Sequence, residues 1–152
     1  MSADRRQPGM DRALARAEAG AAQGEVPVGA VLLDAEGKVL AEAHNRVETD
    51  ADPTAHAELL AIRAAAAARG DARLPDAALY VTLEPCAMCA AAIAFARLRR
   101  VVFGAYDPKG GGVEHGARVF DRPTCHHRPE VVGGVRETTC AALLRGFFRE
   151  RR

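Results

Sequence analysis

The sequence predicts an α/β fold, a three-layer α/β/α sandwich built on a mixed sheet of about five strands. Helical patterns alternate along the chain with short apolar runs typical of strands, and one strand, helix and strand follow each other in the order of a parallel crossover. The chain has 152 residues, 49% of them hydrophobic, which is enough to bury the core of one domain. We therefore expect a single domain over residues 1–152, with residues 1–9 disordered.

The first half of the chain predicts two helices flanking a hairpin. Residues 10–22 carry apolar side chains at helical spacing. Residues 28–33 and 38–43 are short apolar runs separated by a turn-forming cluster, so they should pair as antiparallel strands. Asp52-Pro53-Thr54 is typical of a helix start, and an alanine-rich run follows it to Arg69. A helix is therefore expected to begin near Thr54.

The second half of the chain predicts the crossover and the closing elements. Residues 78–83 and 100–105 are apolar strand patterns on either side of a helical pattern at residues 86–97. Pro108 and four glycines make residues 107–116 a loop. A further strand at residues 130–132 and a helix at residues 138–151 complete the prediction.

Composition excludes several classes of protein. The formal net charge is +1, from 21 basic and 20 acidic residues, so composition alone gives no nucleic-acid footprint. Residues 1–9 contain no apolar signal-peptide core, and no apolar run is long enough to cross a membrane. We therefore expect a cytoplasmic protein with no membrane association. Four cysteines are too few for a secreted disulfide framework.

Two short motifs carry the chemistry, and each opens a predicted helix. His56-Ala57-Glu58 lies near the start of one helix, and Pro85-Cys86-Ala87-Met88-Cys89 lies at the start of another. Two cysteines three positions apart are spaced like the thiolate pair of many zinc sites, and a helix N-terminus favours the thiolate form. His56, Cys86 and Cys89 are thus the predicted ligands of one Zn²⁺ per subunit.

Three protein ligands leave the fourth tetrahedral position of zinc open, as in catalytic rather than structural sites. Zinc in such a site lowers the pKa of water to about 7. A carboxylate is then needed to move protons, and Glu58 is the predicted general acid and base. His56 and Glu58 diverge around a helix, so they can share a target only beyond its N-terminus.

Other interpretations of the cysteines remain open at this point. A lone CxxC pattern also occurs in redox pairs and in structural zinc ribbons. Cys125, His126 and His127 form a rival cluster of metal ligands, and Cys140 is a further thiol. We assign Cys125 and Cys140 to ordinary packing.

With these motifs in place, the chain resembles the cytidine deaminase-like superfamily, whose signature combines HxE with PCxxC. It is most similar to the bacterial tRNA adenosine deaminases, over about residues 24–152. Segments that carry this resemblance are Gly24–Val31, Asn45-Arg46, Asp52–Glu58, Leu79–Cys86, Arg100–Ala105 and Cys140–Leu144.

This resemblance implies a homodimer that converts adenosine to inosine at the wobble position of a tRNA anticodon, with release of ammonia. The target base would be flipped out of the anticodon stem-loop into the zinc pocket. Glu58 would pass protons to a ring nitrogen and to the departing amine. Asn45 would hydrogen-bond the flipped nucleoside, Val28 and Leu83 would line its pocket, and Asp107 and Lys109 would contact neighbouring nucleotides.

Arginines near the pocket motifs and at the C-terminus are candidates for contact with the RNA backbone, since such charges carry much of the affinity for phosphate. They are Arg46, Arg149, Arg151 and Arg152. The chain departs from the family in the loop after Asp107, where small residues ending in Gly-Ser are replaced by Gly110–Gly116, with Val113, Glu114 and His115 in it.

Two alternatives differ from this function in testable ways. A deaminase of a free nucleobase or nucleoside, of the guanine or cytosine type, would use the same zinc site. A non-catalytic zinc-binding or partner subunit would need the ligands but not Glu58.

Overall fold

The structure is a computed structural model that describes residues 2–151, with side chains described from Pro8 to Arg151. Five strands form one mixed sheet in the order β2-β1-β3-β4-β5. β1 is antiparallel to β2 and to β3, whereas β3, β4 and β5 are parallel. The strands are β1 (Gly29–Leu33), β2 (Val39–His44), β3 (Ala78–Leu83), β4 (Arg100–Ala105) and β5 (Glu130–Val132).

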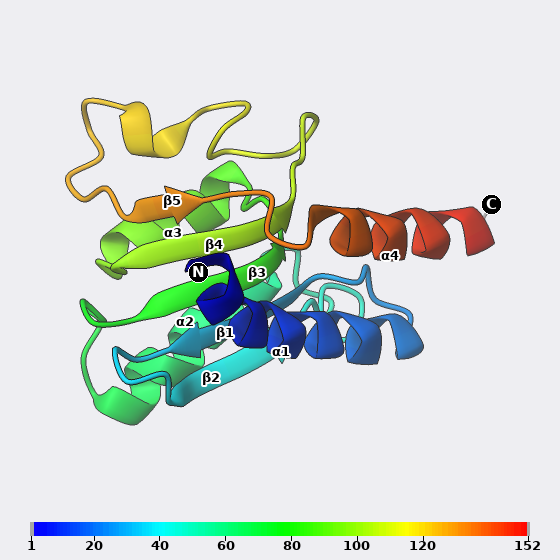
Figure 1. Cartoon of the computed structure of the whole chain (residues 1–152), viewed down its shortest axis with the longest axis horizontal. Helices are drawn as coiled ribbons and strands as arrows, with labels where there is room; N and C mark the ends of the chain where they lie inside the picture. Colours follow the sequence, from blue (N-terminus) through cyan, green and yellow to red (C-terminus); the bar gives the residue numbers. More distant parts are fainter. Residues whose placement is uncertain (1, 152) are drawn as a thin grey trace.

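Helices cover both faces of this sheet, which confirms the predicted three-layer sandwich (Figure 1). The helices are α1 (Ser2–Ala22), α2 (Ala57–Arg69), α3 (Ala87–Phe95) and α4 (Glu137–Glu150). Successive residues of a strand point to opposite faces, so β3 places Leu79 in the core under α2 and α3 and Tyr80 in the core under α1 and α4. The hairpin β1-β2 and the parallel crossover β3-α3-β4 are both as predicted.

α1 extends further toward the N-terminus than predicted. It begins at Ser2 and contains Pro8, so residues 2–9, which we expected to be disordered, are helical. Proline disfavours helical backbone at the preceding residue, which is why the pattern alone placed the start at Met10. Met10 is fully buried, and a Cβ atom added to Gly9 would lie 2.7 Å from the Tyr80 ring. Close packing against β3 therefore outweighs the local preference, while Met1 lies outside the described residues.

α2 begins three residues later than predicted, and this shift determines where His56 lies. Asp52 Oδ1 accepts hydrogen bonds from the Thr54 backbone N–H and hydroxyl, both at 2.8 Å, so residues 52–54 form a turn instead of helix. The first N–H of the helix, from Ala57, is bound by the side chain of Asn45, which follows β2. His56 is therefore the residue just before the helix, with extended backbone.

Among the helices of residues 2–151, none is long and apolar enough to span a membrane.

Candidate active site

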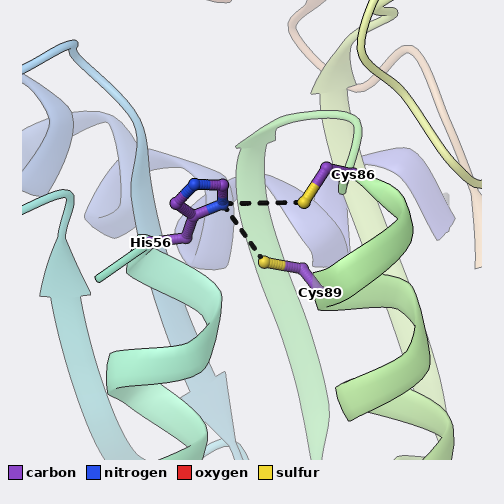
Figure 2. A group of neighbouring side chains, drawn as sticks. All are labelled: His56, Cys86 and Cys89. Carbon is purple, nitrogen blue, oxygen red and sulfur yellow. Dashed lines mark hydrogen bonds between the residues drawn. The ribbon is translucent and has the colours of Figure 1, made fainter. Parts of the chain in front are cut away.

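Three potential metal ligands converge between the N-termini of α2 and α3 (Figure 2). His56 Nδ1 lies 3.6 Å from Cys86 Sγ and 3.5 Å from Cys89 Sγ, and the three ligand atoms lie within 4.8 Å of one another. Within the described residues this is the group of histidine, cysteine and carboxylate side chains close enough to hold a metal ion. The structure therefore brings together the three residues that the sequence predicted as zinc ligands.

The fold brings the two helix starts together at one end of the sheet. β3 ends at Leu83, and three residues later Cys86 precedes α3. β1 is antiparallel to β3, so the start of β1 and the end of β2 lie at that same end, where Gly29 pairs with His44. Asn45 then ties the start of α2 to this edge. Both helices therefore direct their N-terminal N–H groups at the ligands.

The donor set and its spacing fit zinc. Zn–N bonds of about 2.0 Å and Zn–S bonds of about 2.3 Å at a tetrahedral angle separate nitrogen and sulfur by about 3.5 Å. The two nitrogen–sulfur distances, 3.6 Å and 3.5 Å, match this separation. Two thiolates and one imidazole are also ligands that zinc favours. The site therefore fits one zinc ion with one coordination position left open.

Electrostatics favours the anionic form of one thiol. Hydrogen bonds from Cys89 and from His56 lower the pKa of Cys86 to about 4 although burial opposes this. The shared hydrogen bond and burial raise the pKa of Cys89, which is fully buried. The hydrogen bond to Cys86 raises the pKa of His56. Cys86 is therefore poised as the thiolate that metal binding requires.

Glu58 lies in the first turn of α2 and is 4% exposed. Burial raises its pKa to about 7, and the nearby Cys86 adds to this effect. A carboxyl group that titrates near neutral pH can both accept and donate a proton, as a general acid and base must. His56 and Glu58 line the same pocket beyond the start of α2, as their spacing required.

A pocket of about 590 Å³ opens over the potential ligands. It brings together four of the residues predicted to bind substrate, namely Val28, Asn45, Leu83 and Asp107. Asn45 Oδ1 accepts the Ala57 N–H at 2.8 Å, which fixes the side-chain amide and leaves its NH₂ group as the donor for a ligand. The pocket therefore presents a hydrogen-bond donor between apolar walls.

The remaining predicted residues are distributed more widely. Arg151 lines the pocket and lies over the Phe147 ring, with its guanidinium carbon 3.7 Å from the ring centroid. Arg149 lines a separate cavity on α4, and Arg46 is paired with Asp50 at the surface. Lys109 follows Asp107 in the same loop but does not line the pocket. Arg152 lies outside the described residues.

Sequence reasoning missed two buried carboxylates beside the pocket, Glu25 and Glu84, which are 1% and 2% exposed. Glu25 accepts hydrogen bonds from the backbone of Glu48 and from the backbone and hydroxyl of Thr49. Glu84 accepts five hydrogen bonds from residues 107–115. A signal was available, because each acid is flanked by apolar residues and stands one or two positions before a proline.

The rival cluster of metal ligands is not assembled. His127 Nε2 lies 2.7 Å from the Leu98 carbonyl oxygen, and the Cys125 thiol donates to the carbonyl of His127. Cys140 is buried on the opposite face of the sheet, where a Cβ atom on Gly104 would meet its sulfur. Cys125 and Cys140 thus take part in packing, as predicted.

Comparison with known proteins places these features in context. Residues 3–105 match the family described as the cytidine and deoxycytidylate deaminase zinc-binding region. A tRNA-specific adenosine deaminase of Agrobacterium fabrum is 55% identical over 94% of this chain and 93% of its own length. The tRNA-specific adenosine deaminase of Bacillus subtilis is 47% identical over 94% of this chain and 88% of its own.

Solved structures give two further comparisons. A structure from work on A-to-I editing by tRNA:A34 deaminases at the wobble position of transfer RNA is 53% identical, with a TM-score of 0.89 over 91% of this chain and 100% of that one. A guanine deaminase of Bacillus subtilis is 34% identical, with a TM-score of 0.64 over 82% of each chain.

Proposed function

The chain belongs to the cytidine and deoxycytidylate deaminase zinc-binding family and, within it, to the tRNA-specific adenosine deaminases, and from this premise we propose its reaction. It is a zinc-dependent hydrolase that deaminates adenosine to inosine at the wobble position of a tRNA anticodon and releases ammonia. The observation that carries this proposal is the grouping of His56, Cys86 and Cys89, with Glu58 lining the same pocket as His56 and Cys86, in a chain 55% identical to a tRNA-specific adenosine deaminase.

His56, Cys86 and Cys89 would hold one Zn²⁺, which lowers the pKa of water to about 7 and so makes hydroxide available at neutral pH. Glu58 would take the proton from the attacking water and donate it to the adenine ring nitrogen N1 as oxygen bonds to C6. It would then carry the second proton of that water to the amine, so that the C6–N bond breaks and ammonia leaves. Water and adenosine thereby give inosine and ammonia, with Glu58 restored.

The pocket walls would orient the flipped base. Val28, just before β1, and Leu83, at the end of β3, line the pocket and would offer apolar surface to a purine. The Asn45 amide, held by Ala57, would donate a hydrogen bond to the nucleoside. Asp107, with Lys109 beyond it, would contact the neighbouring nucleotides of the anticodon.

Arginines at the rim would provide the contact with the RNA backbone. Arg151 is held over Phe147 at the pocket mouth, so its charge is positioned before RNA arrives. Arg149 and Arg46 lie further out, and Arg152 would extend the same group beyond the described residues. Arginine charges near the pocket favour phosphate in a salt-dependent manner. The anticodon stem-loop is therefore the proposed partner.

A second copy of the chain is a further proposed partner. Phe95 and Met88 project from α3, and Phe95 is 77% exposed, which is unusual for a large apolar side chain. A homodimer that buries this face of α3 would remove that surface from water. We also propose that residues 1–152 act as a single deaminase domain and that the protein works in the cytoplasm, where tRNA is available.

A direct assay separates this function from the deamination of free bases, for which the 34% identity to a guanine deaminase is the specific support. The zinc-loaded protein is incubated with an anticodon stem-loop carrying a wobble adenosine and, separately, with guanine, cytosine and adenosine. We expect inosine in the stem-loop and little turnover of the free compounds. Turnover of guanine with the stem-loop unchanged would overturn the proposal.

A further inference from the structure

Residues 107–116, here called the β4 loop, form one wall of the pocket without regular secondary structure. The loop follows β4 and contributes Asp107 and Gly110 to the pocket. Within the loop, Asp107 Oδ1 accepts the N–H groups of Lys109 and Gly110 at 3.2 Å and 2.9 Å. These local bonds shape the turn but do not attach it to the rest of the fold, so its position must be fixed by other contacts.

Glu84 provides the attachment. Its side chain has no exposure, and its two oxygens accept backbone N–H groups from both ends of the loop. Oε1 accepts from Asp107 at 3.0 Å, and Oε2 accepts from Val113, Glu114 and His115 at 3.1, 2.8 and 3.0 Å. The carboxylate is thus satisfied by donors of a single loop.

The loop also packs directly on the turn that carries the cysteines. A Cβ atom on Gly111 would lie 2.5 Å from Glu84 Oε2, and one on Gly112 would lie 2.5 Å from the Ala87 nitrogen. Gly112 N–H donates to the Pro85 carbonyl at 2.8 Å. Glycine is therefore required at both positions for contact with the segment from Glu84 to Ala87. The pocket wall and the cysteine turn form one packed unit.

His115 adds the one side-chain donor among these contacts. Its Nδ1 lies 2.8 Å from Glu84 Oε1, so the proton is on Nδ1 in the neutral ring and on both nitrogens in the charged ring. Tyr106 packs edge-on against the imidazole, with 6.1 Å between the ring centroids. The His115 side chain faces inward to Glu84 and is one-third exposed.

We propose that His115 and Glu84 are positioning residues: their hydrogen bond fixes the β4 loop and thereby sets how the wall bearing Asp107 receives the nucleotide beside the target base. This inference deepens the proposed function and rests on it for the identity of the substrate. Neither side chain is assigned a step of the reaction. A looser wall should therefore weaken binding of the RNA while the zinc site and Glu58 continue to act.

The test compares His115→Ala, which removes the donor, with His115→Asn, whose side-chain NH₂ can donate from near the Nδ1 position. For a stem-loop carrying a wobble adenosine, we expect His115→Ala to raise KM by about tenfold, the effect of one charge-assisted hydrogen bond, with kcat within about twofold of wild type. Zinc content should not change, and His115→Asn should restore KM to within about threefold.

Hydrogen exchange gives a second readout that does not depend on the substrate. In His115→Ala, the amides of Val113, Glu114 and His115 should exchange faster, and in His115→Asn they should be protected again. Glu25→Gln is the matched control, because Glu25 binds a different loop, so it should affect Glu48 and Thr49 and leave the β4 loop unchanged.

The outcomes separate this inference from the proposed function. If wild type does not deaminate the stem-loop, the proposed function fails, and the exchange data still decide whether His115 holds the loop. If wild type is active and His115→Ala leaves KM unchanged, the inference is wrong. Loss of zinc, or a fall in kcat at unchanged KM, would equally contradict it, because a positioning role in RNA binding predicts neither.

Discussion

The metal centre and the two loops that wall the pocket are built on different principles. At the centre, reactive side chains project from the residues just before two helices and from their first turns, so short motifs place them. The walls, residues 46–52 and the β4 loop, are held by the buried carboxylates Glu25 and Glu84, whose partners are mostly backbone N–H groups. Chemistry in this fold thus depends on side-chain identity, whereas the shape of the pocket depends on where main-chain donors lie.

Among the described residues, neither carboxylate forms a hydrogen bond or an ion pair with an arginine or a lysine. Hydrogen bonds to a carboxylate stabilise its charge, so both acids have a pKa below the ordinary value in spite of burial. They differ in the side chain that donates a further hydrogen bond. This donor is the Thr49 hydroxyl for Glu25 and the His115 imidazole for Glu84. We therefore expect substitutions at the metal centre to impair catalysis, and substitutions at the two walls to impair RNA binding or stability.

The largest effect should come from the centre. Glu58→Ala removes the proposed proton carrier, and general acid–base catalysis contributes about 10²- to 10⁴-fold to a rate, so kcat should fall by that order. His56, Cys86 and Cys89 are unchanged, so zinc content should stay at one per chain. Single-turnover deamination of the stem-loop and metal analysis measure the two quantities.

Native turnover in Glu58→Ala would show that another group moves the protons. If neither wild type nor Glu58→Ala shows turnover while both retain zinc, the result would instead favour a non-catalytic zinc-binding subunit. Cys86→Ser is the comparison variant, because it should lose activity together with zinc.

The contrast between centre and walls also explains what the sequence could predict. His56, Cys86 and Cys89 can be recognised from sequence because few residue types bind zinc. They also lie at the starts of two helices whose sequence patterns are strong. Glu25 and Glu84 were missed because their partners are N–H groups, which every residue except proline carries. The start of α2 was misplaced at Thr54 because its first N–H is bound by Asn45, twelve positions away, and not by a local cap. Packing of Gly9 on Tyr80 likewise extends α1 in a way that local patterns do not encode.

The second-largest effect should be on the stability of the wall held by Glu25. Glu25→Ala leaves the N–H groups of Glu48 and Thr49 without their acceptor, and an unsatisfied buried group costs about 1–3 kcal/mol. Thr49→Val removes only the hydroxyl donor and should cost about 1 kcal/mol. Urea unfolding of the zinc-loaded protein measures both free energies. An equal loss of unfolding free energy in the two variants would mean that the backbone hydrogen bonds to Glu25 contribute nothing to stability.

The smallest effect, a change of stability with pH, tests whether Glu25 is held as an anion. Its pKa lies below the ordinary 4.5 in the folded protein: burial alone would raise it, but hydrogen bonds from Thr49 and Glu48 outweigh that. A group whose pKa is lower when folded stabilises the protein above its unfolded pKa, and this contribution is lost as pH falls through the folded pKa.

The difference in unfolding free energy between wild type and Glu25→Gln should therefore be constant from pH 7 to about pH 5 and shrink at lower pH. Because both proteins carry the same zinc ligands, acid loss of metal affects them alike and cancels in the difference. Urea midpoints at a series of pH values measure it, and a difference that stays constant to pH 3 would mean that the pKa of Glu25 is the same in the folded and the unfolded protein.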